Sequence, residues 1–149
     1  MRILEESDFT ETLRIFTEVF EEEELNTFLS SWITRRKEVS YGIFTGKSLE
    51  GFTIVRNQHI EFIGVDPKNQ GKGIGTHLLH KVMDVLEGDI TLIPLNDEKI
   101  IHWYKKNGFQ IESISVRNGV REILMRLRRE SVESLWRKDI YKVMLPMIV

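Results

Sequence analysis

Three glycines and a lysine in one short polar loop are the residues of this 149-residue chain with the clearest chemical potential. The loop follows an apolar run that predicts a strand and precedes an amphipathic helix expected at residues 74–87. A strand that leads through glycines into a helix presents backbone N–H groups and the positive end of the helix dipole to an anion, most often a phosphate. Gly71, Gly73 and Gly75 leave the backbone open to close approach, and Lys72 adds a cation.

The spacing of the glycines excludes two common phosphate-binding motifs, the P-loop and the dinucleotide fingerprint. The pattern that is present is Gln70-x-x-Gly73-x-Gly75. It resembles the acyl-CoA pyrophosphate loop of the GNAT superfamily of N-acetyltransferases, and this resemblance implies acetyl-CoA as cosubstrate. It also implies cofactor contacts from the end of the strand, the loop and the start of the helix, namely Ile63, Gly64, Val65, Gln70, Gly71, Lys72, Gly73, Ile74, Gly75 and Thr76.

A second segment carries the same resemblance. Residues 97–109 end in Tyr-Lys-Lys-Asn-Gly-Phe, which is similar to the Tyr-x-x-x-Gly-Phe segment of GNAT enzymes, in particular of the histone-lysine acetyltransferase-like branch. The resemblance covers residues 50–110 well and the flanks only by the order of elements. Many members have Asn seven residues before this Tyr, where the chain has Asp97, so Asn96, one residue earlier, is the candidate for that CoA contact.

Acetyl transfer to an amine needs a base. A primary ammonium with a pKa near 10.4 is neutral only about one part in a thousand at pH 7.4, a penalty of roughly 4 kcal/mol. His59 and Glu61 lie two residues apart on one predicted strand, so alternation would put both side chains on the same face. In similar enzymes the base often sits at one of these two positions, directly or through a water, and Glu61 is preferred here over His59. An ordinary polar pair on an edge strand is the alternative.

Two further groups complete the expected chemistry. A backbone N–H can stabilise charge on the thioester oxygen, and the resemblance places this donor at Ile63 or Gly64. The leaving thiolate needs a proton, and the resemblance assigns its donation to Tyr104, for which a core aromatic beneath the last hairpin is the alternative. The chain has no cysteine to carry an acyl intermediate, so direct transfer in a ternary complex is expected.

The acceptor is expected to be a small-molecule or peptide amine. Four glutamates at residues 21–24 fall in the connection between the first two predicted helices, which borders the acceptor cleft in the GNAT fold, and their carboxylates would attract a cation. A solvated acidic helix start is the alternative. His77 and His80 share a helix face but lack a third ligand in the sequence, so no metal site is predicted.

The remaining elements fit around these motifs. Hydrophobic periodicity predicts strands at residues 1–4, 39–45, 51–56, 58–65, 90–95, 110–116 and 120–127, and helices at residues 9–20, 25–36, 74–87 and up to residue 106. Asp8 with Glu11 is expected to form a capping box, and Asn118-Gly119 to turn the last hairpin. Asp97 or Asn96 is expected to cap the helix that ends at residue 106, and Gly108 to be the C-terminal glycine of that helix. This order is that of the α/β (α+β) GNAT fold, with a mixed central sheet of about seven strands, four main helices and an extra C-terminal helix.

Composition narrows the class of protein. The net charge is −2 and the charges are mixed, so a nucleic-acid partner, which usually needs a strongly basic face, is not expected. No apolar run reaches the roughly 20 residues of a membrane span, and the first residues lack the apolar core of a signal peptide. The absence of cysteine fits a reducing compartment. A cytoplasmic enzyme without a membrane partner is therefore expected.

The last nineteen residues are predicted to lie outside the main domain. Ser131 can cap a helix with one apolar stripe, so residues 1–130 are expected to be the acetyltransferase domain and residues 131–149 a helical extension. The extension would pack on the domain or on a second subunit, which makes a homodimer possible. Two other functions stay open: an acyl-CoA sensor of the same fold without turnover, and another kind of nucleotide- or phosphate-binding protein that uses the same loop.

Overall fold

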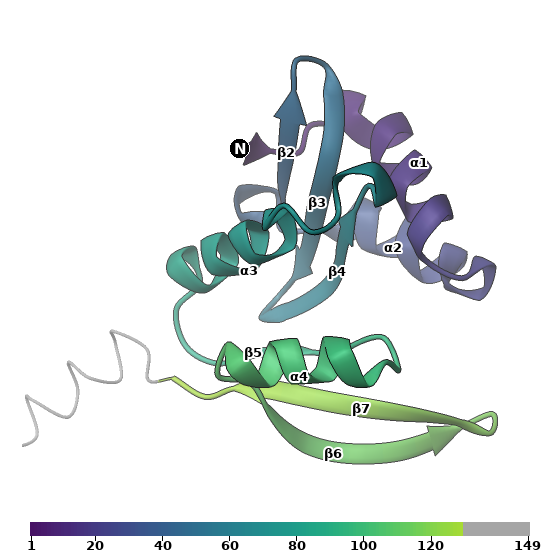
Figure 1. Ribbon diagram of the computed structural model, residues 1–149, viewed down its shortest axis with the longest axis vertical. Coiled ribbons are helices and arrows are strands. Elements are labelled where there is room, and N and C mark those ends of the chain that lie inside the picture. Colours follow the sequence, from purple (N-terminus) through teal and green to yellow (C-terminus); the bar gives the residue numbers. More distant parts are fainter. Residues whose placement is uncertain (130–149) are drawn as a thin grey trace, which may run out of the picture. The chain divides into compact units, whose positions relative to one another are not determined.

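The computed structural model describes residues 1–129 (Figure 1). The helical extension predicted at residues 131–149 lies outside this part of the chain, so the extension, its boundary at residue 130 and the homodimer assigned to it stay predictions. The chain divides into two compact units, Met1–Leu86 and a second one that begins at Glu87.

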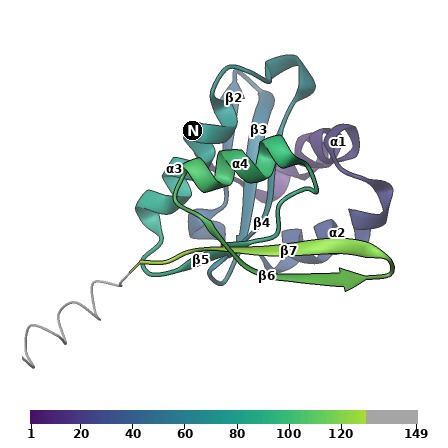
Figure 2. The same ribbon diagram turned by 60° about the horizontal axis from the view of Figure 1, so that its bottom comes forward.

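The first unit is an antiparallel sheet of four strands in the order β1-β2-β3-β4. Helices α1 and α2 lie on one face of this sheet and α3 lies on the other (Figures 1 and 2). The elements of this unit are β1 (Arg2–Ile3), α1 (Phe9–Val19), α2 (Leu25–Thr34), β2 (Tyr41–Thr45), β3 (Ser48–Arg56), β4 (His59–Val65) and α3 (Ile74–Val85).

Aromatic side chains form the core between the sheet and the pair α1 and α2. Phe16 of α1 stacks on Phe28 of α2 with ring centroids 4.4 Å apart. Both rings meet Phe62 of β4 edge-on, at 5.7 and 5.8 Å. Burial of one such side chain contributes about 1.5–3 kcal/mol. This cluster therefore fixes α1 and α2 against β4, the strand that carries the candidate base.

On the opposite face, Gly51 of β3 allows α3 to approach the sheet closely. A Cβ atom at this position would lie 2.7 Å from Cγ2 of Ile74 and 3.3 Å from Cδ1 of Leu78. Both residues belong to α3 and both are buried. The missing side chain at residue 51 therefore sets the distance between the sheet and the first turns of α3, directly after the glycine loop.

Replacing Gly51 with Ala should lower the free energy of unfolding by about 1–3 kcal/mol, because an added methyl group overpacks the contact with Ile74. Urea unfolding of the purified protein measures this change. Ser48→Ala is the matched control, since residue 48 is exposed on the same strand and should change stability by less than about 0.5 kcal/mol. Equal effects of the two substitutions would contradict the close packing.

The second unit combines α4 with three antiparallel strands in the order β5-β7-β6. Its elements are β5 (Ile90–Leu92), α4 (Glu98–Lys106), β6 (Gln110–Arg117) and β7 (Val120–Leu127). Asn118 and Gly119 both have positive φ, 52° and 77°, as a type I′ hairpin turn requires, so the predicted turn is confirmed. Strand β5 ends at Leu92 rather than at residue 95, because Pro94 has no N–H for a strand ladder.

The seven strands and four α-helices of residues 1–129 confirm the predicted α/β class. The predicted capping box of Asp8 and Glu11 is wrong. Asp8 accepts the backbone N–H of Glu5 at 2.7 Å and pairs with Arg2 at 2.8 Å. Glu11 pairs instead with Nε of Arg14 at 2.7 Å. Both carboxylates instead bind arginines through charge-assisted hydrogen bonds.

Candidate active site

The glycine loop joins β4 to α3. Gly71 and Gly73 have φ of +82° and +80°, a region that costs other residues about 1–2 kcal/mol, so the loop needs glycine at both positions. Gly73 is the N-cap of α3 and provides no side-chain capping bond. Gly75 lies inside the helix and does not have positive φ. The turn therefore does not need glycine at residue 75.

Exposed polar residues make up the loop itself. Residues 70–73 are all exposed. Nε2 of Gln70 donates to the backbone O of Val65 at 3.4 Å, and Nζ of Lys72 donates to Oδ1 of Asn69 at 3.1 Å. The loop thus offers exposed backbone and a cation at a helix N-terminus, which is an arrangement that suits a phosphate group.

The other residues expected to contact the cofactor flank the loop. Ile63 and Gly64 belong to the end of β4, and Ile74 and Thr76 to the first turn of α3. Ile74 is only 8% exposed and fixes the start of the helix in the core. A Cβ atom at Gly64 would lie 2.7 Å from Cε1 of Phe52. Core packing therefore needs glycine at residue 64, whatever its backbone N–H does in a reaction.

Strand β4 has a bulge at Glu61. The register pairs Ile60 and Phe62 with two consecutive residues of β3, which leaves Glu61 without a partner on that strand. Ile60 and Phe62 therefore point to opposite faces although they are two residues apart. The strict alternation that the sequence predicted between His59 and Glu61 is interrupted by this extra residue.

His59 and Glu61 nevertheless lie close together, around an arginine. Arg56 is the strand partner of His59 across the turn between β3 and β4. Nη1 of Arg56 lies 3.7 Å from Oε1 of Glu61, whose side chain is 19% exposed. The charge of Glu61 also acts on the ring of His59. The two candidate bases and Arg56 thus form one cluster at the start of β4.

Burial lowers the pKa of His59 below its ordinary value of 6.5, because desolvation penalises the imidazolium form. The negative charge of Glu61 opposes this shift, and the positive charge of Arg56 adds to it. His59 is therefore neutral at pH 7 and keeps a nitrogen lone pair. A carboxylate beside a neutral imidazole can accept a proton from an ammonium group.

Tyr104 lies on α4, in the second unit. It is 7% exposed, and its ring centroid is 5.7 Å from that of Phe109. Burial raises the pKa of Tyr104 above its ordinary value of 10, so the phenol stays protonated at neutral pH and can act as a hydrogen-bond or proton donor. Gly108 has φ of +98° directly after the helix, as predicted for a C-terminal glycine.

Asn96 and Asp97 lie directly before α4 and bind different groups. Oδ1 of Asp97 accepts the backbone N–H groups of Lys99 at 2.8 Å and Ile100 at 3.4 Å, and so caps the helix as predicted. Asn96 is exposed, and its Oδ1 accepts a hydrogen bond from Nη2 of Arg121 at 3.2 Å. The contact between Asn96 and CoA stays a prediction.

Two other sequence features lie in the first unit. The glutamates at residues 21–24 are all exposed between α1 and α2, and His77 and His80 are exposed on α3. Among residues 1–129, no three His, Cys, Asp or Glu side chains gather as a metal site would require. In the same part of the chain, no helix has both the length and the apolar character needed to cross a membrane.

Comparison with known families shows to which family this chain belongs. A family model described as an acetyltransferase (GNAT) domain matches residues 31–111, more than half of the 149 residues. The chain belongs to the GNAT acetyltransferase family. The matched region includes the glycine loop, the His59–Glu61 cluster and Tyr104. GNAT acetyltransferases use acetyl-CoA, so the predicted family, enzyme class and cosubstrate are confirmed at the level of the family.

Solved structures confirm the predicted GNAT fold. The protein PH1933 from Pyrococcus horikoshii OT3 has a TM-score of 0.71 at 21% identity, and the match covers 87% of this chain and 96% of that protein. Naa50 of Arabidopsis thaliana was solved with the bisubstrate analogue CoA-Ac-MVNAL. It has a TM-score of 0.65 at 18% identity, and the match covers 83% of this chain and 93% of Naa50.

One curated relative is similar over a shorter region. The peptidyl-lysine N-acetyltransferase YjaB of Salmonella typhimurium is 28% identical over 61 residues, which are 41% of this chain and 42% of that protein. The similarity thus spans less than half of the relative's length and does not assign its acceptor to this chain.

Sequence reasoning missed two arginines beside the candidate residues. Arg56 pairs with Glu61 across a strand turn, and no local motif marks such a pair. Arg14 of α1 holds the carboxylate of Asp66 at 2.9 Å, although 52 residues separate them. Asp66 directly precedes the first turn of the glycine loop. Only the folded chain brings these residues together.

Proposed function

We propose that the chain is an acetyl-CoA-dependent N-acetyltransferase that moves an acetyl group to a primary amine by direct transfer in a ternary complex. The observation that carries this proposal is the glycine loop at the start of α3, in a chain of the GNAT family. Gly71 and Gly73 keep the loop in a backbone conformation that glycine adopts readily. The exposed loop and the helix N-terminus suit the pyrophosphate of CoA.

In the proposed reaction, Glu61 removes a proton from the acceptor ammonium, directly or through a water, with neutral His59 beside it. The amine nitrogen then bonds to the thioester carbon, and the backbone N–H of Ile63 or Gly64 stabilises the negative charge on the carbonyl oxygen. The nitrogen of this tetrahedral adduct loses its second proton to solvent, and Glu61 also returns its proton to solvent. When the C–S bond breaks, the electron pair stays on sulfur and Tyr104 supplies a proton to the thiolate. Solvent then restores the proton of Tyr104.

Titration calorimetry with acetyl-CoA, CoA and ATP in parallel tests the proposed cosubstrate. We expect acetyl-CoA to bind tightly and ATP to bind weakly. Binding of ATP without binding of CoA would favour another nucleotide- or phosphate-binding protein with the same loop. If no CoA species binds, the proposed function is wrong.

The acceptor that we propose is an amine on a small molecule or a peptide. The four exposed glutamates at residues 21–24 support a cationic acceptor, because carboxylates raise the local concentration of cations. A screen of polyamines, lysine peptides and peptides with free N-termini, read out as release of the CoA thiol, would identify it. Acetyl-CoA binding without turnover on any amine would favour the alternative function, a non-catalytic acyl-CoA sensor.

The cytoplasmic location and the homodimer predicted from the sequence belong to the same proposal. Cell fractionation tests the location. Analytical ultracentrifugation of the full chain tests the oligomeric state, and a monomer at micromolar concentration would remove the homodimer from the proposal.

Replacing Gly75 with Glu should raise the Kd of acetyl-CoA about 10- to 100-fold, that is by roughly 1.4–2.8 kcal/mol. Residue 75 has ordinary helical backbone, so the substitution brings no turn strain, but the new carboxylate would fill the start of α3 and repel a phosphate. Calorimetry measures the Kd, and Gly75→Ala is the matched control because it adds no charge. Similar affinities of the wild type and the Glu variant would mean that phosphates do not bind at this helix start.

A further inference from the structure

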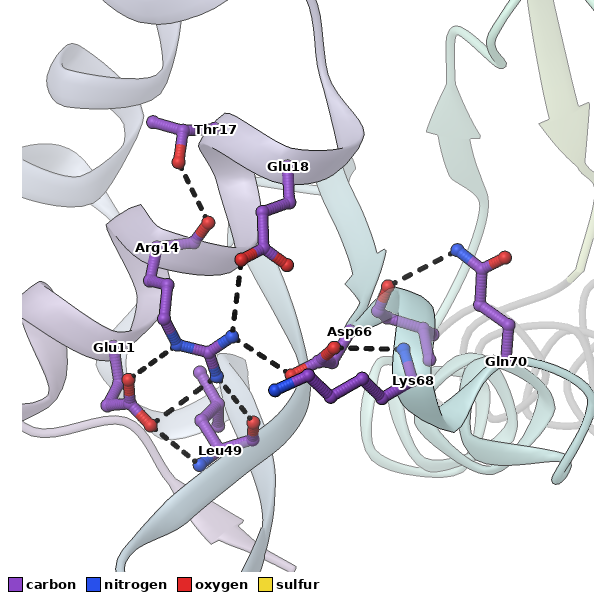
Figure 3. Close-up of polar contacts among 9 residues, drawn as sticks. Glu11, Arg14, Thr17, Glu18, Leu49, Asp66, Lys68 and Gln70 are labelled. Carbon is purple, nitrogen blue, oxygen red and sulfur yellow. Dashed lines mark hydrogen bonds and ion pairs between the residues drawn. The ribbon is translucent and has the colours of Figure 1, made fainter.

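A network of charged side chains joins α1 to the segment that leads into the glycine loop. Arg14 of α1 is its centre (Figure 3). The guanidinium donates to Glu11 on the same helix at 2.7 Å, to the backbone O of Leu49 on β3 at 3.2 Å, and to Oδ2 of Asp66 at 2.9 Å. Oε1 of Glu11 in turn accepts the backbone N–H of Leu49 at 3.2 Å. One arginine therefore holds a helix, a strand and the residue after β4.

Asp66 is fixed through all of its polar groups. It is only 3% exposed. One carboxylate oxygen binds Arg14, and the other accepts the backbone N–H of Lys68 at 3.0 Å, which caps the short turn Pro67–Asn69. Its own N–H donates to the backbone O of Glu50 at 2.8 Å. The Lys68 N–H and the Arg14 guanidinium both lower the pKa of Asp66, so it stays charged at neutral pH.

The glycine loop has few other fixed points. Asp66 is buried at its beginning and Ile74 at its end, whereas most residues between them are exposed. Gly71 and Gly73 add conformational freedom in the middle. A loop that binds a ligand through its backbone must be held in the bound geometry beforehand, because ordering it on binding costs affinity. The fixed ends therefore determine how well the loop is arranged before a ligand arrives.

We infer that Arg14 is a positioning residue for acetyl-CoA: acting through Asp66, it holds the first turn of the glycine loop in place from α1. This inference rests on the proposed function, because it assumes that the loop binds the cosubstrate. Arg14 itself is not part of the loop. Its substitution should weaken acetyl-CoA binding and leave the chemical step unchanged.

Arg14→Gln tests this inference. We expect the Kd and the KM for acetyl-CoA to rise about tenfold, with kcat and the KM of the amine nearly unchanged. Asp66→Asn should give a similar rise. The double variant should bind acetyl-CoA with about the same Kd as whichever single variant binds it more weakly, because both substitutions break the same contact between Arg14 and Asp66. Loss of amide protection at Lys68 in hydrogen exchange would report the released turn independently.

Arg2→Gln is the matched control. Arg2 binds Asp8 through Nη1 and Nη2, at 2.8 and 3.0 Å, and the side chain of Asp8 is 9% exposed compared with 5% for Asp66. Both arginine substitutions thus leave a nearly buried carboxylate without its cation, but only Arg14→Gln touches the glycine loop. We expect comparable losses of melting temperature and an unchanged Kd for Arg2→Gln.

The outcomes separate this inference from the proposed function. A wild-type protein that binds no CoA species overturns the proposed function and the role of Arg14 with it. If the wild type binds acetyl-CoA and Arg14→Gln binds equally well, only the role of Arg14 is overturned. A rise in Kd for Arg2→Gln equal to that for Arg14→Gln also overturns it, because the effect would then come from general destabilisation.

Discussion

Replacing Tyr104 with Phe should lower kcat about 100-fold and leave the Kd of acetyl-CoA nearly unchanged. The substitution removes one hydroxyl from a side chain that is 7% exposed and keeps the ring that packs against Phe109. Burial raises the pKa of Tyr104, so the wild-type phenol carries its proton throughout the neutral range. Without that proton, the thiolate must leave as an anion or take a proton from water. Steady-state kinetics with a reactive amine, together with calorimetry, measures both quantities.

Tyr41→Phe is the control for this experiment. Tyr41 is also buried, and its hydroxyl donates to the backbone O of Glu38 at 3.2 Å, so the control removes a comparable hydroxyl from β2 in the first unit. It should leave kcat unchanged. An unchanged kcat in Tyr104→Phe as well would contradict the donor role and leave Tyr104 as a core aromatic of the second unit.

Local patterns predicted those parts of the fold that depend on neighbouring residues in the chain. The Asn118-Gly119 turn needs two residues that tolerate positive φ, and these two have it. Asp97 caps α4 because a short polar side chain directly before a helix reaches its first N–H groups. Gly71 and Gly73 are glycines because their backbone requires it. In each case the physical cause lies within a few residues and is readable from the sequence.

Long-range contacts account for what the sequence did not predict. Asp8 and Glu11 have the spacing of a capping box, but arginines at residues 2 and 14 pair with them instead. The bulge at Glu61 depends on the register with β3, which no pattern within β4 reveals. The motif therefore located the glycine loop, whereas the groups that fix the loop and the candidate base became visible only in the folded structure.

Replacing both His59 and Glu61 with Gln should lower kcat/KM at pH 7 about 10²- to 10⁴-fold, the usual contribution of a general base. Gln keeps a polar side chain in the cluster with Arg56, so the start of β4 should retain its shape. Circular dichroism and the melting temperature check this point. His102→Gln is the control, because His102 is exposed on α4 and has no part in the proposed reaction.

The pH profile decides which of the two residues takes the proton. Because burial lowers the pKa of His59 below 6.5, a base at His59 loses activity only as the pH falls through that lowered pKa, so the rising limb of kcat/KM lies below pH 6.5. In the double variant this limb should disappear, and the rate should follow the concentration of free amine, rising about tenfold per pH unit toward the amine pKa near 10.4.

If Glu61→Gln alone reproduces the pH profile of the double variant, Glu61 is the base and His59 assists it. If His59→Gln alone does so, the roles are exchanged. A rising limb that survives both substitutions would assign the base to solvent or to another residue, and would make His59, Glu61 and Arg56 an ordinary polar cluster at the start of β4.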